Sequence, residues 1–464
     1  MVEVLSNYLD AFDGWMYTYL LLILLAAAGI YFTIRTKFVQ FRLLKEAFRV
    51  ITEKKHDEKG VSSFQSMMIS TASRVGTGNI AGVSTAICLG GAGAVFWMWL
   101  MAILGGATAF IESTLAQVYK VKKGDEFRGG PAYYIQTALK NRKLGILFAI
   151  FLILCFAYGF NGLQSYNVSS AIEYYFPGSK IVPIVVGLVL AVLTAIVIFG
   201  GVKRIGFITS GLVPVMAILY IVMALIVVFS NLSAIPNMFR TIFEQAFDFK
   251  AIFGGFTGSC MMLGIKRGLF SNEAGMGSAP NAAASANVSH PAKQGLVQML
   301  SVFLDTIVIC SATALMLLLS GVGPTAEAAG MPYVQAAVNS RFGSLGILII
   351  TIAIFLFAFS SLVGNYYYTE SNLRFIKDND SLLFAFRCTA VVWIFIGAQM
   401  NLVMAWSLAD ILMGFMAIVN IFAIFFLGHI AIDTMQDYIE KKKSGENPIF
   451  KASDIGLTDT ECWK

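Results

Sequence analysis

The sequence predicts an all-α polytopic membrane protein of about eleven transmembrane helices. Of its 464 residues, 57% are hydrophobic and only 13% are charged, and the mean hydropathy is +0.74. A soluble domain of this length could not bury so much apolar surface, and apolar runs near the ~20 residues that span a bilayer recur along the chain. The expected spans are 16–36, 63–90, 93–119, 144–172, 181–201, 205–231, 251–286, 291–320, 343–370, 382–400 and 402–434.

The charges of the connections support this count independently. Lysine and arginine are concentrated in alternate connections, such as 35–62, 120–143 and Lys441–Lys443, whereas the opposite set, such as 173–180 and 232–250, is poor in both. Basic connections tend to stay in the cytoplasm, so we expect the N-terminus outside and the C-terminus in the cytoplasm. The net charge of +6 therefore relates to orientation in a lipid bilayer of the cell membrane, and we expect no nucleic-acid partner.

The order of the spans predicts four parts. Residues 1–62 form an accessory helix, which has no polar interruption, and a cytoplasmic basic loop. The ten spans that follow divide into two sets of five, at 63–231 and 232–434, and 435–464 form a cytoplasmic tail. The first set begins in the cytoplasm and the second outside, so the two halves have opposite topology, which is the plan of an inverted repeat.

Each set begins with a span that glycine and polar residues interrupt. The first contains Thr71-Ala72-Ser73-Arg74-Val75-Gly76-Thr77-Gly78-Asn79-Ile80-Ala81-Gly82, and the second contains Lys266-Arg267-Gly268-Leu269-Phe270-Ser271-Asn272-Glu273-Ala274-Gly275-Met276-Gly277. Both include Asn-x-Ala-Gly. Irregular backbone is stable at membrane depth only where it is buried in protein or lines a cavity. Two such spans in corresponding halves indicate the binding site of a secondary transporter.

The residues of the first break predict its chemistry. Unwinding at Gly76-Thr77-Gly78 would free carbonyls on one side, and the half-helix beginning near Asn79 would direct N–H groups at an anion such as a carboxylate. Carbonyl and hydroxyl oxygens suit Na⁺, so an amino-acid zwitterion with Na⁺ fits such a site. The alternative is that the small residues serve tight helix packing, as Gly90-Gly91 would. Packing alone, however, requires no arginine, threonine or asparagine between the glycines.

Three motifs resemble known transporters. Val75-Gly76-Thr77-Gly78-Asn79 resembles the break in the first core helix of sodium-coupled, LeuT-like transporters. Gly129-Gly130-Pro131-Ala132-Tyr133-Tyr134 and Gly268-Leu269-Phe270-Ser271-Asn272-Glu273-Ala274-Gly275-Met276-Gly277-Ser278-Ala279-Pro280 resemble motifs of the alanine/glycine:cation symporter family, and the resemblance covers nearly the whole chain. It implies a five-plus-five inverted repeat and Na⁺-driven uptake of alanine or glycine by alternating access. Na⁺ would be the co-transported ion, with no organic cofactor, and the protein would function as a monomer.

The resemblance also implies site residues. The backbone of Gly76, Thr77 and Gly78 would hold the substrate carboxylate, with the side chain of Asn79 close by. The remaining expected substrate contacts are Gln164, Phe270, Ser271, Asn272, Glu273 and Met276. The expected Na⁺ ligands are the carbonyls of Ala72 and Val75 and the hydroxyls of Ser360 and Ser361.

Several alternatives remain open from the sequence. The two adjacent serines could instead bond to the preceding turn of their own helix. Glu273 could hold the substrate ammonium or pair with Arg74, Lys266 or Arg267. A second Na⁺ would need a ligand from around Asp305, where no clear match occurs.

Other functional classes fit less well. An intramembrane hydrolase would need a nucleophile with its base, or a metal motif such as His-Glu-x-x-His, and the sequence has neither. A channel would more naturally show a pore-loop filter in an oligomer. Proton coupling remains the alternative within transport.

Overall fold

The computed structural model describes residues 2–53, 60–200, 202–249, 252, 259–445 and 447–464. Regular structure in these residues is helical apart from one antiparallel hairpin of β1 (Val121–Lys123) and β2 (Glu126–Arg128), in which Val121 lies opposite Arg128. The predicted all-α polytopic class is confirmed.

Nine helices in the described residues are long and apolar enough to cross a membrane, and each corresponds to one expected span. They are Asn7–Arg35, Ala94–Val118, Arg142–Glu173, Ile181–Ile198, Phe207–Phe229, Pro291–Leu318, Met331–Ile376, Asp380–Gly397 and Leu402–Lys443. The other two expected spans, 63–90 and 251–286, are the interrupted ones. Residues 251 and 253–258, at the start of the second, lie outside the described residues.

The elements that build these spans are mostly single α-helices. Those in the first half of the chain are α1 (Val2–Met16), α2 (Leu22–Arg35), α5 (Ser63–Arg74), α6 (Ala81–Gly90), α7 (Ala94–Val118), α9 (Arg142–Ile153), α10 (Asn161–Glu173), α11 (Ile181–Ile198) and α12 (Val202–Phe229). Those in the second half are α15 (Cys260–Asn272), α16 (Ala279–Ser285), α17 (Pro291–Phe303), α18 (Ser311–Leu318), α19 (Met331–Ile376), α20 (Asp380–Gly397) and α21 (Leu402–Lys443). Short helices α3 (Val39–Arg42), α4 (Leu44–Ile51), α8 (Pro131–Ala138) and α13 (Ile235–Ala246) lie in the connections.

Within the residues that the structure describes, three spans contain a π-helical turn. These turns are η1 (Tyr17–Leu21) between α1 and α2, η3 (Leu154–Phe160) between α9 and α10, and η6 (Leu304–Cys310) between α17 and α18. Such a turn shifts the side chains that follow it around the helix axis and is frequent at functional sites. Hydropathy does not reveal these turns, because they do not change the apolar composition of a span.

Three spans are longer than the sequence predicts. The first helix begins at Val2 instead of residue 16, α21 continues to Lys443 instead of 434, and α19 covers Met331–Ile376 instead of 343–370. The additional segments are more polar. A span predicted from hydropathy therefore stops where the apolar stretch stops, although the helix continues. Within α19, Gly343 has φ +60° and ψ −152°, which marks a kink where the apolar part begins.

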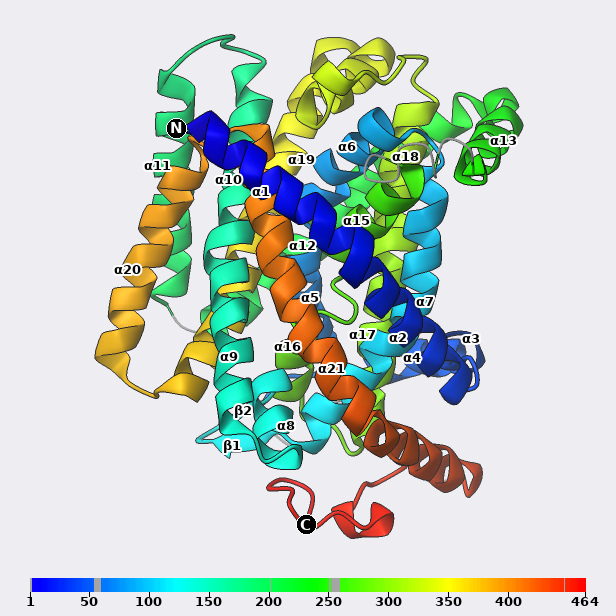
Figure 1. Cartoon of the computed structure of the whole chain (residues 1–464), viewed down its shortest axis with the longest axis vertical. Coiled ribbons are helices and arrows are strands. Elements are labelled where there is room, and N and C mark those ends of the chain that lie inside the picture. Colours follow the sequence, from blue (N-terminus) through cyan, green and yellow to red (C-terminus); the bar gives the residue numbers. More distant parts are fainter. Residues whose placement is uncertain (1, 54–59, 201, 250–251, 253–258, 446) are drawn as a thin grey trace.

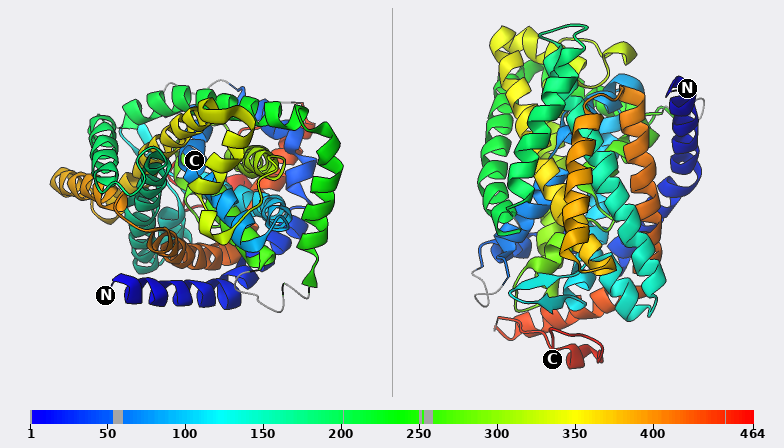
Figure 2. Two further views of the ribbon diagram at one scale, coloured as in Figure 1. Left: turned by 90° about the horizontal axis from the view of Figure 1, so that it is seen from above. Right: turned by 90° about the vertical axis from the view of Figure 1, so that its left-hand side faces the viewer.

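The termini lie at opposite ends of the helical bundle (Figure 1). The basic connections that contain α3, α4, α8 and the hairpin lie at the end that carries the C-terminus, together with the end of α21. This distribution is the one that the orientation prediction requires. The N-terminal helix lies along one side of the bundle, where α1 packs on α21 and α2 packs on α7 (Figure 2).

The two broken spans run in opposite directions at the centre of the bundle. In Figure 1 the chain rises from α5 to α6 and descends from α15 to α16. As a result, α15 packs against α6 and α16 packs against α5, while α7 packs against both α15 and α16. The two breaks are thereby brought together.

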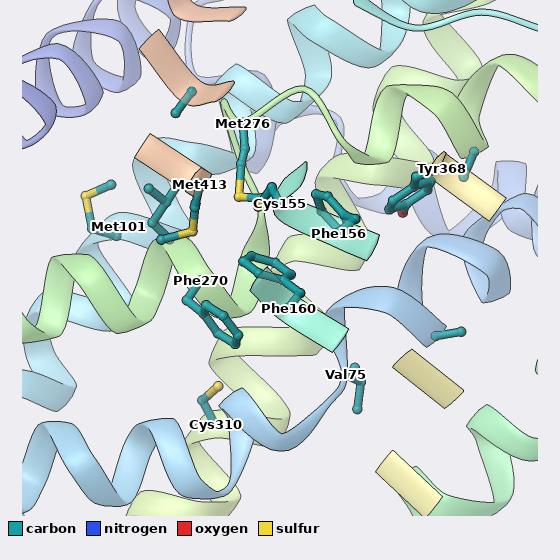
Figure 3. Packing of buried hydrophobic residues seen from close by; sticks show 14 of the residues in the cluster. Val75, Met101, Cys155, Phe156, Phe160, Phe270, Met276, Cys310, Tyr368 and Met413 are labelled. Carbon is teal, nitrogen blue, oxygen red and sulfur yellow. The ribbon is translucent and has the colours of Figure 1, made fainter. Parts of the chain in front are cut away.

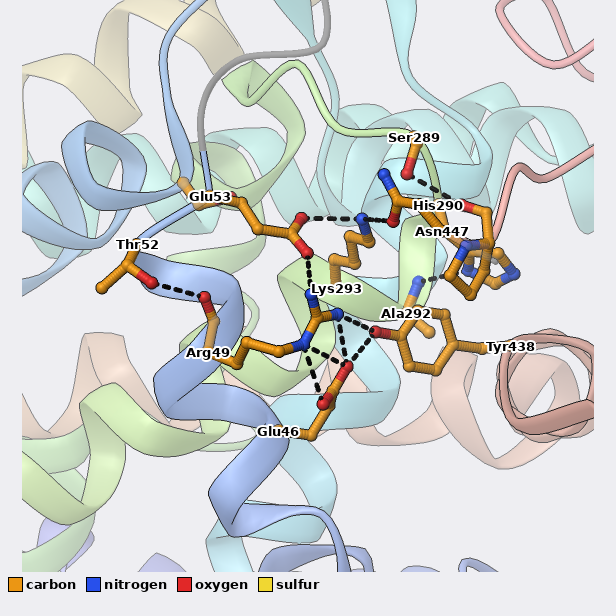
Figure 4. Close-up of polar contacts among 12 residues, drawn as sticks. Glu46, Arg49, Thr52, Glu53, Ser289, His290, Ala292, Lys293, Tyr438 and Asn447 are labelled. Atoms are coloured by element: carbon orange, nitrogen blue, oxygen red, sulfur yellow. Dashed lines mark hydrogen bonds and ion pairs between the residues drawn. The ribbon is translucent and has the colours of Figure 1, made fainter. Parts of the chain in front are cut away.

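A polar network lies where the chain returns from the second broken span to α17 (Figure 4). Lys293 Nζ pairs with Glu53 Oε2 at 2.7 Å and donates to Asn447 Oδ1 at 2.6 Å. Beside it, His290 Nε2 lies 2.9 Å from Asp437 Oδ2. Burial lowers the pKa of His290 to about 4, so near neutral pH this contact joins a neutral imidazole to a carboxylate.

The C-terminal tail packs back on the same end of the bundle. Its core consists of Phe450, Ala452 and Trp463, which lie against Ala286 and Val288 just after the second broken span. The Trp463 indole donates to the Gln117 carbonyl at 2.7 Å. The tail is therefore a folded part of the protein.

Candidate functional site

The first broken helix leaves the α-conformation where its glycines predict. Helix α5 begins with a capping box, in which the Ser62 and Gln65 side chains each bond to the backbone of the other residue. It ends at Arg74, and a 3₁₀ turn, η2 (Thr77–Asn79), precedes α6. Gly76 is extended, with φ −128° and ψ −158°, and its N–H donates to Asn79 Oδ1 at 3.0 Å. Asn79 thus holds the break open through its own side chain.

The second broken helix opens between Asn272 and Ala279. Glu273 has φ +55°, and Gly275 and Gly277 each have φ +85°. Glycine adopts this left-handed region without cost, whereas glutamate rarely does. The predicted position of the second break is therefore correct, and Glu273 is held in a conformation that its neighbours must enforce.

The two breaks are joined by a buried hydrogen-bond cluster. Asn79 Nδ2 donates to Ser271 Oγ at 3.0 Å and to Asp305 Oδ1 at 2.7 Å. Ser271 Oγ donates in turn to Asp305 Oδ2 at 2.6 Å. Asn79 and Ser271 were both expected at the site. Asp305 was given no role from sequence, because nothing in its neighbourhood reveals the π-helical turn η6 in which it lies.

Gln164 lies against the first break, as expected. Its Oε1 accepts a hydrogen bond from the Thr77 N–H at 2.9 Å. Asn167, one turn further along α10, donates to Thr77 Oγ1 at 2.9 Å. A Cβ on Gly76 would overlap both the Gln164 amide and the hydroxyl of Ser361. Close contact, not an unusual torsion, therefore requires glycine at position 76.

An aromatic ring covers the first break. The Phe270 ring lies against Gly78, where an added Cβ would overlap it. The same ring packs on Phe160, with centroids 4.6 Å apart, and on Trp406, at 5.1 Å. Figure 3 shows Phe270 beside Phe160, which is the last residue of the π-helical turn η3. The space above Gly78 is therefore bounded by aromatic side chains.

Two other expected contacts lie within the second break itself. Asn272 Oδ1 accepts from the Ala274 N–H at 3.0 Å. Met276 is fully buried and belongs to the apolar cluster drawn in Figure 3. Both side chains shape the second break.

The expected Na⁺ ligands are only partly brought together. Ser361 Oγ donates to the Ser73 carbonyl at 3.1 Å, next to Ala72 and close to Val75 at the end of α5. Ser360 Oγ instead bonds to the Phe357 carbonyl of its own helix at 2.9 Å. The two serines therefore differ: Ser361 faces the break, and Ser360 shows the back-bonding that was left open as an alternative.

The close approach of α19 to α5 has a simple cause. Gly364 lies where a Cβ would come within 2.6 Å of the Ser73 backbone nitrogen. Without a side chain at this position, the two helices come near enough for Ser361 to reach a carbonyl on α5.

Charged residues near the breaks fall into two groups. Arg267 pairs with Asp410 at 2.8 Å, and Lys266 pairs with Asp410 at 2.9 Å and with Asp13. Lys266 and Arg267 are therefore not partners of Glu273, which corrects that alternative from the sequence. Their group is electrically balanced and ties the N-terminal helix to α15 and α21.

The second group is not balanced. Glu112, Glu273 and Asp305 are completely buried, and none forms an ion pair within 4.0 Å in the described part of the chain. Arg74 is the buried cation whose charge reaches all three. Its Nη1 donates at 3.5 Å to Gln298, while its Nε and Nη2 have no hydrogen-bond partner in the described residues.

Comparison with known proteins is consistent with this geometry. The family model described as "Sodium:alanine symporter family" matches residues 2–452. The chain is 49% identical to the amino-acid carrier protein AlsT of Bacillus subtilis, over 97% of this chain and 95% of that protein. It is 44% identical to the probable sodium/glutamine symporter GlnT of Bacillus subtilis, over 100% of this chain and 97% of that protein. It is also 39% identical to the sodium/alanine symporter AgcS of Methanococcus maripaludis, over 91% of this chain and 95% of that protein.

Proposed function

The chain belongs to the sodium:alanine symporter family, and we propose that it carries alanine or glycine across the cell membrane together with Na⁺, binding both where its two broken helices meet. It is a multi-pass membrane transporter and not an enzyme. The observation that carries the proposal is the cluster of Asn79, Ser271 and Asp305, which joins the two unwound segments inside a bundle of apolar helices.

The first break supplies the groups that an amino-acid carboxylate needs. The N–H groups around Gly76, Thr77 and Gly78 precede the half-helix α6, whose N-terminal end favours an anion. In the structure Gln164 Oε1 accepts from the Thr77 N–H. A bound carboxylate would take over this donor, and Gln164 would turn its amide N–H toward the substrate.

The second break forms the opposite side of the proposed substrate site. Phe270 lies directly against Gly78 and limits the space above the first break, while Ser271, Asn272, Glu273 and Met276 shape the segment behind it. These features favour alanine or glycine over the larger glutamine, which the name of one relative mentions.

Na⁺ would bind at the end of α5. The carbonyls of Ala72 and Val75 lie in its last turn and in the break, and the Ser361 hydroxyl reaches the same place from α19. The C-terminal end of a half-helix carries partial negative charge and is a recurrent Na⁺ site in transporters. Ser360 would join these ligands only by giving up its bond to its own helix.

The direction of transport is set by the Na⁺ gradient across the cell membrane. With the basic connections in the cytoplasm, the N-terminus lies outside, and the C-terminal tail is cytoplasmic. The inward Na⁺ gradient then drives uptake by alternating access to the central site, with opposite ends of the two antiparallel broken helices opening in turn.

Uptake of labelled alanine by proteoliposomes tests this function. An inward Na⁺ gradient should concentrate alanine inside, and replacing Na⁺ with K⁺ should abolish accumulation. Unlabelled glycine should compete more strongly than glutamine. Equal accumulation from a pH gradient without Na⁺ would contradict sodium coupling, and flux that only dissipates an alanine gradient would indicate a channel.

A further inference from the structure

Glu112, Glu273 and Asp305 are the buried carboxylates near the breaks that form no ion pair in the described residues, and Glu273 has the least complete set of hydrogen-bond donors among them. Glu112 accepts from two backbone N–H groups and a side-chain amide, and Asp305 accepts from an amide and two hydroxyls. In the described residues Glu273 accepts only from the hydroxyls of Ser73 and Ser278. A hydroxyl, unlike an N–H group, can turn and offer its lone pairs to a cation.

The hydroxyl of Ser73 cannot satisfy both of its neighbours. It lies 2.6 Å from Asn365 Oδ1 and 3.1 Å from Glu273 Oε1, but it carries a single proton. Donation over the shorter distance leaves Glu273 Oε1 facing oxygens. Three oxygen atoms therefore meet at this point with one proton between them.

A fourth oxygen lies beside them. The Tyr368 hydroxyl is completely buried, next to the hydroxyl of Ser73 and close to Glu273. Asn365 and Tyr368 share a face of α19 with Ser361, since they follow it at four and seven residues.

The helix ends around this cluster favour a positive charge. Helix α5 ends at Arg74 and α15 ends at Asn272, so the negative ends of two half-helices converge beside Glu273. The Arg74 guanidinium does not fill the position, because its hydrogen bonds go to Gln298 on α17.

Glu273 is completely buried and forms no ion pair within 4.0 Å in the described residues. A zwitterionic amino acid adds no net charge, so a cation in this cluster would compensate the ionised carboxylate.

We propose that Glu273, Ser73, Ser278, Asn365 and Tyr368 form a second Na⁺ site, distinct from the one at Ser361. This proposal rests on the proposed symport function. Ser361 and Asn365 are four residues apart on α19, so the two ions would be separated by about 6 Å along that helix. The protein would then carry two Na⁺ ions with each amino acid.

The cage of oxygens could also suit the ammonium group of the substrate, so the experiment separates the two cations. Equilibrium binding of ²²Na⁺ to the purified full-length protein, without amino acid and then with saturating alanine, counts the ions directly. Labelled alanine binding across a range of Na⁺ concentrations gives its affinity and its sodium dependence. The variants are Glu273→Gln and Ser278→Ala, with Glu46→Gln as the control at a buried carboxylate that pairs with Arg49 and Lys442 away from the breaks.

We expect two Na⁺ per wild-type protein and one per Glu273→Gln protein, with the sodium Hill coefficient of alanine binding falling from about 2 to about 1. Ser278→Ala, which keeps the carboxylate, should weaken the binding of the second Na⁺ about tenfold, and Glu46→Gln should keep both ions.

A single Na⁺ in the wild type, or an unchanged count in Glu273→Gln, would overturn the proposal. Loss of alanine affinity at every Na⁺ concentration with the ion count unchanged would assign the cage to the ammonium group instead. Failure of the proposed function looks different: the wild type would then not accumulate alanine on a Na⁺ gradient, whatever its ion count.

Discussion

The side chain of Asn79 donates a hydrogen bond to Asp305 Oδ1 over 2.7 Å, and this contact joins residues 226 positions apart in the chain. The backbone carbonyl of Asn79 accepts at the same time from Thr313 Oγ1, at 2.6 Å, from the helix that follows Asp305. One span, Pro291–Leu318, therefore holds Asn79 by its side chain and by its backbone carbonyl. A movement of the first break would be transmitted to that span. Four predictions follow from this and related contacts.

Asp305→Asn should reduce Na⁺-driven alanine uptake at least tenfold. Asparagine has a similar shape, but it offers one acceptor oxygen and a donor group where the aspartate accepts from both Asn79 and Ser271. The new NH₂ group would then face Ser271 and Thr306, whose hydroxyls would have to change from donating to accepting, and the negative charge is lost. A loss of about 1.4 kcal/mol corresponds to a factor of ten. Initial rates of uptake into proteoliposomes measure the effect.

Thr306→Val is the control for the Asp305 prediction. It removes one hydroxyl that donates to Asp305 Oδ2 at 2.9 Å and leaves the carboxylate in place, so a loss of no more than about threefold is expected. Wild-type rates for Asp305→Asn would show that this carboxylate is not needed for transport.

Ser361→Ala should raise the Na⁺ concentration for half-maximal uptake about tenfold, whereas Ser360→Ala should change it less than twofold. Ser361 bonds across to the Ser73 carbonyl, while Ser360 bonds within its own helix. The two variants remove the same atom from adjacent buried positions, so each controls for general effects of the substitution. Sodium titrations of the initial uptake rate distinguish them. Equal shifts in the two variants would remove Ser361 from the proposed Na⁺ site.

Particular residues show which features of the fold and the site can be predicted from the sequence. Both breaks were predictable, because Gly76, Gly78, Gly275 and Gly277 interrupt spans that are otherwise apolar. Asn79 and Ser271 were predictable as well, since polar side chains beside a break have few other uses at membrane depth. Gln164 was expected only from the fold that the family resemblance implies.

The contacts that sequence reasoning missed depend on packing between distant helices. The role of Asp305 depends on the turn η6, because π-helical turns leave no mark in composition or periodicity. The pairing of Lys266 and Arg267 with Asp410 joins α15 to a helix more than 140 residues away, so the signs of the charges were known but not their partners. The difference between Ser360 and Ser361 follows from the rotation of α19 about its axis.

Gly78→Ala should weaken alanine binding at least tenfold while leaving ²²Na⁺ binding in the absence of alanine unchanged. The new Cβ would overlap the Phe270 ring, which bounds the substrate side of the break. Gly76→Ala should weaken the binding of alanine and also the binding of Na⁺, because its Cβ would overlap the side chains of both Gln164 and Ser361.

Gly211→Ala is the control for the glycine substitutions. It lies in α12 with no atom within 4 Å of the added Cβ, and alanine favours a helix over glycine by about 1 kcal/mol. This variant should bind alanine and Na⁺ normally and melt no lower than the wild type. Normal alanine binding by Gly78→Ala would show that the substrate does not reach the first break.

The last prediction concerns acid stability at the end of the bundle that carries the C-terminus. Burial lowers the pKa of His290 to about 4, from an unfolded value near 6.5, because the charged imidazole is poorly solvated there. The folded protein therefore binds fewer protons than the unfolded chain between these two values. The stability that neutral His290 contributes is fully present above pH 6.5. As the pH drops toward 4, the free energy of unfolding falls by up to about 1.4 kcal/mol per pH unit from this one group. The groups that face the imidazole include Asp437, Lys441 and Lys293.

His290→Gln keeps a polar side chain beside Asp437 but cannot titrate, so its melting temperature should fall less steeply than that of the wild type between pH 6.5 and 5. Thermal unfolding of the two proteins in the same detergent, at half-unit steps of pH, measures the difference. Parallel curves would show that the imidazole does not control acid stability at this end of the bundle.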